Sequence, residues 1–299
     1  MARGVLALAA VALLAAGCGT ATGSTVGKTS PSPKLTVTKI GTLPQALSKA
    51  AAVALPGGKL MILGGYTGST SLRTILEGTP QRLRIVGHLP LATHDAAAVD
   101  FGNAVYLLGG GSSVSTPSVV RIDPSTGAAR EAPALSEPLS DLGAVVVGGR
   151  IYLVGGYTST TFASAILVYP LSGGTQTVSR LTQATRYAGV TAIGGTIYVA
   201  GGLTTAGPTD AIYAVNPSEH PRRIGTLPRP EDHAALAALN GTLYYVGGRR
   251  VLAIDPGSGK VTVAAQLPVP LSDPTATTVG NRIIVAGGGT NEVWALKPA

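Results

Sequence analysis

Six Gly-Gly pairs recur along the chain, and this repeat constrains the fold more than any other feature of the sequence. Each pair follows a short run of apolar and β-branched residues, and the pairs begin at Gly64, Gly109, Gly155, Gly201, Gly247 and Gly287. They are 45, 46, 46, 46 and 40 residues apart. A leucine precedes each pair in the same phase, at Leu43, Leu89, Leu135, Leu181, Leu227 and Leu267. A period in this range indicates a repeat protein in which each unit buries its apolar faces against its neighbours.

One repeat, residues 135–180, shows how each unit is built. Apolar runs at 141–147, 151–154 and 165–169 and a more polar run at 176–181 are separated by turn residues such as Gly148-Gly149. The 41 glycines and 21 prolines of the chain supply such turns throughout. Four short strands per unit are typical of a β-propeller blade. The sequence therefore predicts an all-β, six-bladed propeller of four-stranded antiparallel blades.

The two ends of the repeat region complement each other. The last repeat stops after three predicted strands, and residues 35–44 share the string IGTLP with the fourth strand of another repeat at 222–228. We expect this N-terminal strand to complete the sixth blade and to remove the open edges of the ring.

The N-terminus differs from the repeats. Arg3 is followed by an apolar run over residues 5–16, which is too short to span a bilayer as a helix and fits a secretory signal. The segment ends at Cys18, the only cysteine, in a string that resembles the bacterial lipobox. The predicted organisation is a lipoprotein-type signal peptide at 1–18, a flexible tether rich in Ser, Thr, Gly and Pro at 19–34, and one propeller at 35–299. The predicted location is extracytoplasmic, lipid-anchored to the bacterial cell membrane through Cys18, or secreted if Cys18 is not lipidated.

The repeat resembles that of the kelch family over residues 35–299. The resemblance rests on the double glycines, on a Tyr before four of them and on the Asp123-Pro124 and Asp255-Pro256 turns. The Trp that the family carries after this turn is absent, because Ala129 and Val261 stand there. The resemblance implies a propeller of six or seven blades and leaves the subfamily open.

In a propeller the loops before the innermost strands share one face around the central channel, where ligands usually bind. In this chain those loops carry Ser48/Lys49, His94/Asp95, Ser140/Asp141, Arg186/Tyr187, Asp232/His233 and Ser272/Asp273. The loops between second and third strands add Tyr66, Tyr157, Arg249 and Arg250. The predicted ligand-binding residues are Lys49, Tyr66, His94, Asp95, Asp141, Tyr157, Arg186, Tyr187, Asp232, His233, Arg249, Arg250 and Asp273. The alternative is that they only cap turns and line a hydrated channel.

The fifth repeat is six residues shorter than the others, and its channel-face loop is reduced to Arg249-Arg250. This basic pair is where the repeat departs from its own pattern, so it is the first place to expect a function on that face.

Three classes of function remain open. The first is a non-catalytic module that binds a protein, glycan or peptide of the cell envelope. The second is a small-sugar enzyme resembling kelch-type sialate mutarotases, with Asp95, Asp232 and His233 as catalytic candidates for acid–base work in the channel. A structural or assembly role is a third possibility. Copper chemistry of the galactose-oxidase type is disfavoured because it requires a cysteine within the propeller, whereas the only cysteine is Cys18, before the repeats begin.

No motif predicts a cofactor or a metal site. The formal net charge is +8, but the basic residues are scattered and the secretory signal argues against nucleic acid as a partner. We expect a monomer, anchored to the membrane through Cys18, with a protein or glycan partner.

Overall fold

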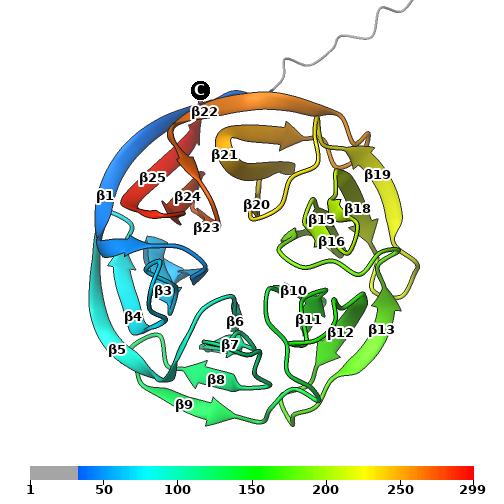
Figure 1. Cartoon of the computed structure of the whole chain (residues 1–299). Coiled ribbons are helices and arrows are strands. Elements are labelled where there is room, and N and C mark those ends of the chain that lie inside the picture. Colours follow the sequence, from blue (N-terminus) through cyan, green and yellow to red (C-terminus); the bar gives the residue numbers. More distant parts are fainter. Residues whose placement is uncertain (1–32) are drawn as a thin grey trace, which may run out of the picture. The chain divides into compact units, whose positions relative to one another are not determined.

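Each repeat folds into one blade of a six-bladed ring (Figure 1). The structure, a computed structural model, describes residues 33–299. The predicted signal peptide with Cys18 and residues 19–32 of the predicted tether lie outside the described residues. Within 33–299 the only helix is the single turn η1 (Pro56–Gly58), and no helix of this part is long and apolar enough to cross a membrane.

The strands take equivalent positions in successive blades. The innermost strands are β2 (Ala51–Leu55), β6 (Ala97–Phe101), β10 (Gly143–Val147), β14 (Gly189–Ile193), β20 (Ala235–Leu239) and β23 (Pro274–Val279). The second strands are β3 (Lys59–Leu63), β7 (Ala104–Leu108), β11 (Arg150–Val154), β15 (Thr196–Ala200), the first half of β21 (Thr242–Ile254) and β24 (Arg282–Gly287).

The outer half of each blade follows the same order. The third strands are β4 (Leu72–Thr79), β8 (Val119–Ile122), β12 (Ala165–Tyr169), β18 (Ala211–Val215), the second half of β21 and β25 (Thr290–Pro298). The outermost strands are β5 (Arg82–Thr93), β9 (Ala129–Ala132), β13 (Gln176–Arg180), β19 (Arg222–Thr226), β22 (Val261–Leu271) and β1 (Leu35–Leu47). Two strands of two residues each, β16 (Leu203–Thr204) and β17 (Gly207–Pro208), form a small hairpin between β15 and β18 of the fourth blade. All pairings within blades are antiparallel, as predicted.

The ring closes through the N-terminal strand, as predicted. β1 pairs with β25 from Leu35 opposite Pro298 to Leu47 opposite Thr290, so the sixth blade has the order β1-β25-β24-β23. Figure 1 shows the blue β1 running along the outer rim beside the red β25. Because the first and last strands of the propeller pair in one sheet, the sixth blade has its full four strands and the ring is closed.

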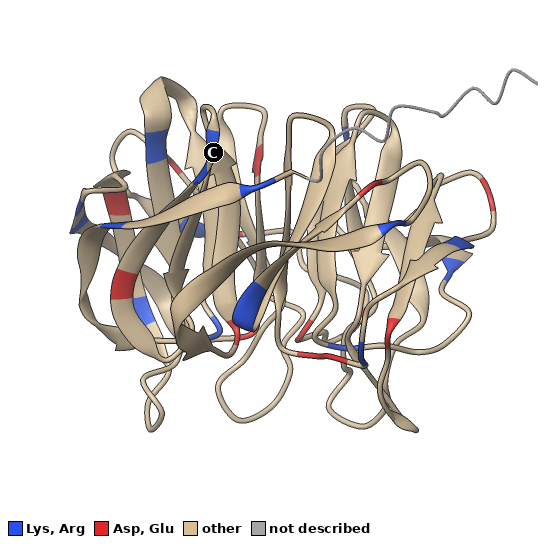
Figure 2. Ribbon diagram, turned by 90° about the horizontal axis from the view of Figure 1, so that it is seen from above, with Lys and Arg blue, Asp and Glu red and all other residues tan. Residues whose placement is uncertain are grey.

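Six apolar clusters form the core, one between each pair of neighbouring blades. The cluster between the second and third blades, for example, includes Leu108 of β7 and Leu153 of β11. The second strands are almost entirely buried because both of their faces meet a neighbouring blade. The six leucines that precede the Gly-Gly pairs in the sequence repeat are all buried, so this repeated position belongs to the core. In the side view of Figure 2, Lys and Arg are interspersed with Asp and Glu over the blades.

In every blade except the fifth, the Gly-Gly pair lets the segment that enters the next blade pass close to the end of the second strand. Gly155 has φ +61°, and a Cβ placed on it would lie 2.3 Å from the carbonyl oxygen of Thr185. The amide of the next residue, Gly156, donates a hydrogen bond to that same carbonyl at 2.9 Å. Side chains would prevent this approach, so the pair is required where the chain crosses toward the next blade.

The two irregular spacings also have structural causes. The first repeat contains the extra residue in the hairpin Pro56–Gly58, which forms η1. In the fifth blade the first half of β21 pairs with β20 and the second half pairs with β22. The chain therefore reverses between Val246 and Val251, and the predicted short loop is this short connection between the second and third strands.

Candidate functional site

One residue from each blade forms a ring around the channel mouth, which we call the collar. Its members precede the innermost strands and all have left-handed backbones, with φ between 51° and 57°: Lys49, Asp95, Asp141, Tyr187, His233 and Asp273. Left-handed backbones are uncommon for residues other than glycine, and they are often found at functional sites. The positive φ had no signal in the sequence, although the six positions themselves were predicted.

Backbone hydrogen bonds join collar residues of neighbouring blades. The amide of Asp95 donates to the carbonyl of Lys49 at 3.0 Å, and the amide of Asp141 donates to the carbonyl of Asp95 at 2.8 Å. Equivalent bonds run from Lys49 to Asp273, from Tyr187 to Asp141 and from Asp273 to His233. Between Tyr187 and His233 the described residues form no such bond, and the two rings stack with centroids 4.0 Å apart. The collar therefore fixes these side chains close to the axis of the ring.

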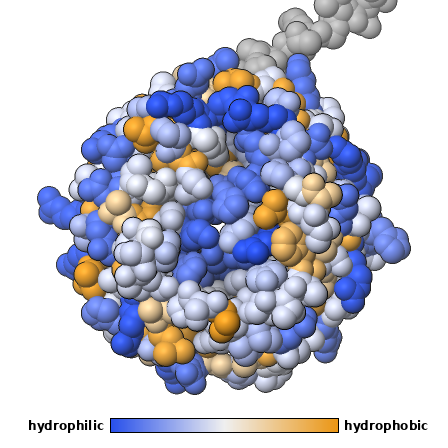
Figure 3. All heavy atoms as spheres, viewed as in Figure 1, coloured by the Kyte–Doolittle hydropathy of each residue, from blue (hydrophilic) through white to orange (hydrophobic). Residues whose placement is uncertain are grey.

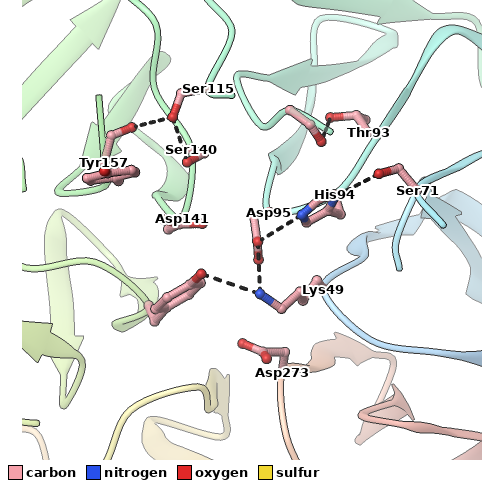
Figure 4. A network of polar contacts seen from close by, with 12 residues as sticks. Lys49, Ser71, Thr93, His94, Asp95, Ser115, Ser140, Asp141, Tyr157 and Asp273 are labelled. Atoms are coloured by element: carbon pink, nitrogen blue, oxygen red, sulfur yellow. Dashed lines mark hydrogen bonds and ion pairs between the residues drawn. The ribbon is translucent and has the colours of Figure 1, made fainter. Parts of the chain in front are cut away.

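Lys49 is the first of two cations at the mouth. Its Nζ lies 3.1 Å from Asp95 Oδ2 (Figure 4). The same atom is 3.3 Å from the hydroxyl of Tyr187. Burial acts to lower the pKa of Lys49, but the charges of Asp95, Tyr187 and Asp273 outweigh burial and raise this pKa above its ordinary value. Lys49 is therefore protonated at neutral pH and already paired with a carboxylate.

Arg186 is the second cation, and it is enclosed by partners. Its Nη2 lies 2.6 Å from Asp141 Oδ2 and donates a hydrogen bond of 2.6 Å to the hydroxyl of Tyr187. The guanidinium also stacks over the Tyr157 ring at 4.4 Å. The contact with Asp141 is an ion pair without hydrogen-bond alignment, so Asp141 Oδ2 and Arg186 Nε are buried without a hydrogen-bond partner.

Asp141 is the most buried carboxyl of the collar, with its side chain 2% exposed. Burial and the nearby charge of Asp95 raise the pKa of Asp141 to about 7, against the opposing effect of Arg186. At neutral pH this carboxyl is therefore present in both protonated and ionised forms. Burial also raises the pKa of Asp273, opposed by His233 and Lys49.

His94 lies beside the collar. Its Nδ1 is 2.9 Å from Ser71 Oγ and its Nε2 is 3.6 Å from Asp95 Oδ2 (Figure 4). Its ring lies 5.0 Å from that of Tyr66. Burial lowers the pKa of His94 further than the charge of Asp95 raises it. The imidazole is therefore neutral at pH 7.

A pocket of about 270 Å³ opens beside the collar on its blade 2 and blade 3 side, and we call it the polar pocket. Lys49, Asp95, Asp141, Arg186 and Tyr187 line it together with His94, Tyr157, Ser140, Ser159 and the loop Gly111–Ser115. The space-filling view in Figure 3 shows a hollow at the centre of this face with hydrophilic residues around it.

Serine hydroxyls organise the wall of the polar pocket. Ser115 Oγ lies 2.9 Å from Ser140 Oγ and donates to the carbonyl of Tyr157 at 3.0 Å. The amide of Ser115 donates to Ser159 Oγ at 2.7 Å. Sequence reasoning did not single out Ser115, Ser159 or the Gly111–Ser115 loop. The signal was available, since this loop is the blade 2 counterpart of the loops that hold Tyr66 and Tyr157.

The structure brings most, but not all, of the predicted residues together. Seven of them line the polar pocket: Lys49, His94, Asp95, Asp141, Tyr157, Arg186 and Tyr187. His233 and Asp273 line a smaller hollow of about 110 Å³ at the centre of the collar. Tyr66 packs behind His94, and Asp232 pairs with His233 Nδ1 at 3.1 Å; neither lines these two hollows.

Arg249 and Arg250 lie apart from the polar pocket. Arg249 donates a hydrogen bond to the carbonyl of Pro268, and Arg250 Nη2 lies 2.7 Å from Glu231 Oε1. Neither side chain lines the polar pocket or the hollow at the centre of the collar. Glu231, which also pairs with Arg229, was not singled out from the sequence.

Within residues 33–299 no group of three or more His, Cys, Asp or Glu side chains is arranged to hold a metal ion. The side chains at the mouth supply hydroxyl groups, two paired cations, three carboxyls and the imidazoles of His94 and His233.

Comparison with known proteins agrees with this architecture. The sequence model of the Kelch motif matches residues 138–177, which include β10–β12 of the third blade and the first two residues of β13. No curated protein sequence matches significantly. Among solved structures, that of YjhT is similar with a TM-score of 0.73 and 12% sequence identity, over 86% of this chain and 95% of that one. At this identity the likeness concerns the fold alone. The chain is therefore a six-bladed β-propeller that carries a Kelch motif in its third blade.

Proposed function

We propose that this protein is a non-catalytic binding module that takes a neutral sugar unit of an envelope glycan into the polar pocket. The observation that carries the proposal is a wall rich in hydroxyl groups beside cations that are already paired. Serine and tyrosine hydroxyls both donate and accept hydrogen bonds, which suits the hydroxyl groups of a sugar.

The charge balance favours a neutral ligand over an acidic one. Lys49 is paired with Asp95 and Arg186 with Asp141, so neither cation of the polar pocket is available without breaking an ion pair. Asp273 adds a third carboxyl at the collar. An anionic ligand would therefore meet repulsion from carboxylates and would have to displace one from its cation.

The size of the pocket limits the ligand to a small unit. Ligand pockets usually enclose about 300–1,000 Å³, and the polar pocket with about 270 Å³ lies just below that range. It therefore suits one monosaccharide, or the terminal unit of a longer chain that extends into solvent.

The same geometry gives the enzyme alternative a specific basis. Asp141, with a pKa of about 7, lies next to Asp95, and a carboxyl of this kind can donate a proton at neutral pH while a neighbouring carboxylate accepts one. Asp232 supports this alternative less, because it lies outside the polar pocket.

The proposal is tested by titrating the methyl glycosides of glucose, galactose, mannose and N-acetylglucosamine, with binding followed by ligand-observed NMR. We expect at least one to bind, and methyl glucuronide to bind more weakly than methyl glucoside. Ser113→Trp, which places a bulky ring at the edge of the polar pocket, is expected to weaken binding about tenfold or more, a loss of ~1.4 kcal/mol.

The control for this substitution is Ser69→Trp, in the corresponding exposed loop of blade 1 and outside the polar pocket. It should leave the affinity unchanged. Absence of binding by all four methyl glycosides, or tighter binding of the glucuronide, contradicts the proposal. Conversion of a bound sugar into a product in the same spectra would favour the enzyme instead.

We further propose that the propeller acts outside the cytoplasm, held to the membrane by lipidation of Cys18. The support is the sequence alone: an apolar run of signal-peptide length that ends at the only cysteine. Membrane fractionation of a Cys18→Ala variant tests this. We expect its release from the membrane fraction, and retention at the parent level would contradict the anchor.

A further inference from the structure

A third hollow, of about 300 Å³, lies across the Gly111–Ser115 loop from the polar pocket, and its lining is mostly apolar. We call it the apolar hollow. Its walls come from the end of β5 and from blade 2, and its apolar lining residues include Leu89, Leu91, Leu107, Val114 and Val120. It therefore lies between the first two blades, whereas the polar pocket lies toward the collar.

The polar pocket and the apolar hollow are separated by the Gly111–Ser115 loop. Gly111, Ser112 and Val114 line both of them. The base of this loop is fixed, because the amide of His94 donates to the carbonyl of Gly111 at 2.9 Å and the amide of Gly111 donates back at 3.1 Å. Its tip is exposed. A ligand that crosses the tip of this loop would have one part in each hollow.

The rim of the apolar hollow holds the two most exposed large apolar side chains of the described residues. Leu91 is 66% exposed and Val114 is 67% exposed, whereas the other exposed large apolar side chains reach at most 49%. Apolar side chains that are solvent-exposed around a hollow indicate a contact site for an apolar group. Their place next to the polar pocket indicates that the same ligand covers both.

We propose that the ligand is an amphipathic glycoside, whose sugar occupies the polar pocket and whose alkyl chain crosses the Gly111–Ser115 loop into the apolar hollow. This inference rests on the proposed sugar binding and adds the class of group attached to the sugar. The alkyl chain gains affinity by removing its own surface and that of Leu91 and Val114 from water.

The test compares methyl, butyl and hexyl glycosides of each of the four sugars, below their micelle-forming concentrations, by calorimetry or NMR titration. Each methylene that enters the apolar hollow should raise the affinity roughly three- to fourfold until the hollow is filled. Leu91→Ser should remove most of the gain from butyl and hexyl chains while leaving methyl glycoside binding unchanged. The matched control is Leu171→Ser, which changes another exposed leucine, one in the turn between β12 and β13 of blade 3.

The outcomes separate the two proposals. If methyl glycosides bind and longer chains bind no more tightly, the amphipathic ligand is excluded and sugar binding stands. A third outcome is that Ser113→Trp leaves the affinity for hexyl glycosides unchanged while Leu91→Ser abolishes their binding. In that case the protein recognises the alkyl chain alone, which overturns both proposals. Equal effects of Leu91→Ser and Leu171→Ser also overturn the assignment to the apolar hollow.

Discussion

A variant that lacks residues 35–41 is expected to lose the closed ring and to unfold at a much lower temperature than the parent protein. The deletion removes most of the pairing between β1 and β25, from Leu35 opposite Pro298 to Gly41 opposite Val293. It also removes Leu35, which is buried between the fifth and sixth blades, and the half-buried Val37 and Ile40. At roughly 1.5–3 kcal/mol for each fully buried side chain, the loss is several kcal/mol. That is a large part of the 5–15 kcal/mol typical of a folded domain.

The deletion also exposes β25 as a new sheet edge, so concentration-dependent association should accompany the loss of stability. Thermal unfolding followed by circular dichroism, together with size-exclusion chromatography, measures both effects. The control is the double variant Thr36→Ala/Thr38→Ala, which changes two exposed side chains of the same strand and keeps its backbone. It should melt close to the parent. A deletion variant that melts at the parent temperature would show that β1 does not close the ring.

Gly155→Ala is expected to destabilise the protein by about 3 kcal/mol or more, because the new Cβ would lie 2.3 Å from the carbonyl oxygen of Thr185. That carbonyl is held in place by the amide of Gly156 at 2.9 Å, so the crossing segment has to shift as a whole. For a domain of this size the expected fall in melting temperature is roughly 6–12 °C. Calorimetric or circular-dichroism melting measures it.

The matched control is Gly148→Ala, in the hairpin between β10 and β11. Gly148 has nearly the same backbone, with φ +55°, but a Cβ there would meet no atom within 4 Å. Only the conformational preference is lost at this position, which costs about 1 kcal/mol. Similar losses for the two variants would mean that backbone conformation alone, and not the close approach to Thr185, explains the Gly-Gly pair.

The sequence predicted where the residues of the candidate site lie, but not which of their side chains pair with one another. The Leu marker places Lys49, Asp95 and Asp141 at the same point of three successive blades, and this was sufficient to predict that they lie at the channel mouth. That Arg186 pairs with Asp141 and Lys49 with Asp95 depends on distances of 2.6 and 3.1 Å between side chains of different blades. Such distances follow from the radius and register of the closed ring, which a repeat period does not specify.

The basic pair Arg249-Arg250 shows the opposite case. Its position in the shortened repeat predicted a role on the channel face, but neither arginine lines the polar pocket or the hollow at the centre of the collar. The side chains instead contact Pro268 and Glu231. Side-chain identity alone did not reveal these partners.

The sequence by itself determined the number of blades, the strand order within them and the closure by residues 35–44, because each of these follows from a repeated pattern of apolar and turn residues. Tertiary structure decided the collar, its left-handed backbones and the hydroxyl-rich pocket beside it. The reason is that the collar residues are 40 or 46 positions apart along the chain and meet only when all six blades have packed around one axis. The hydrogen bonds and charges that define the site are then formed between blades, where no local pattern records them.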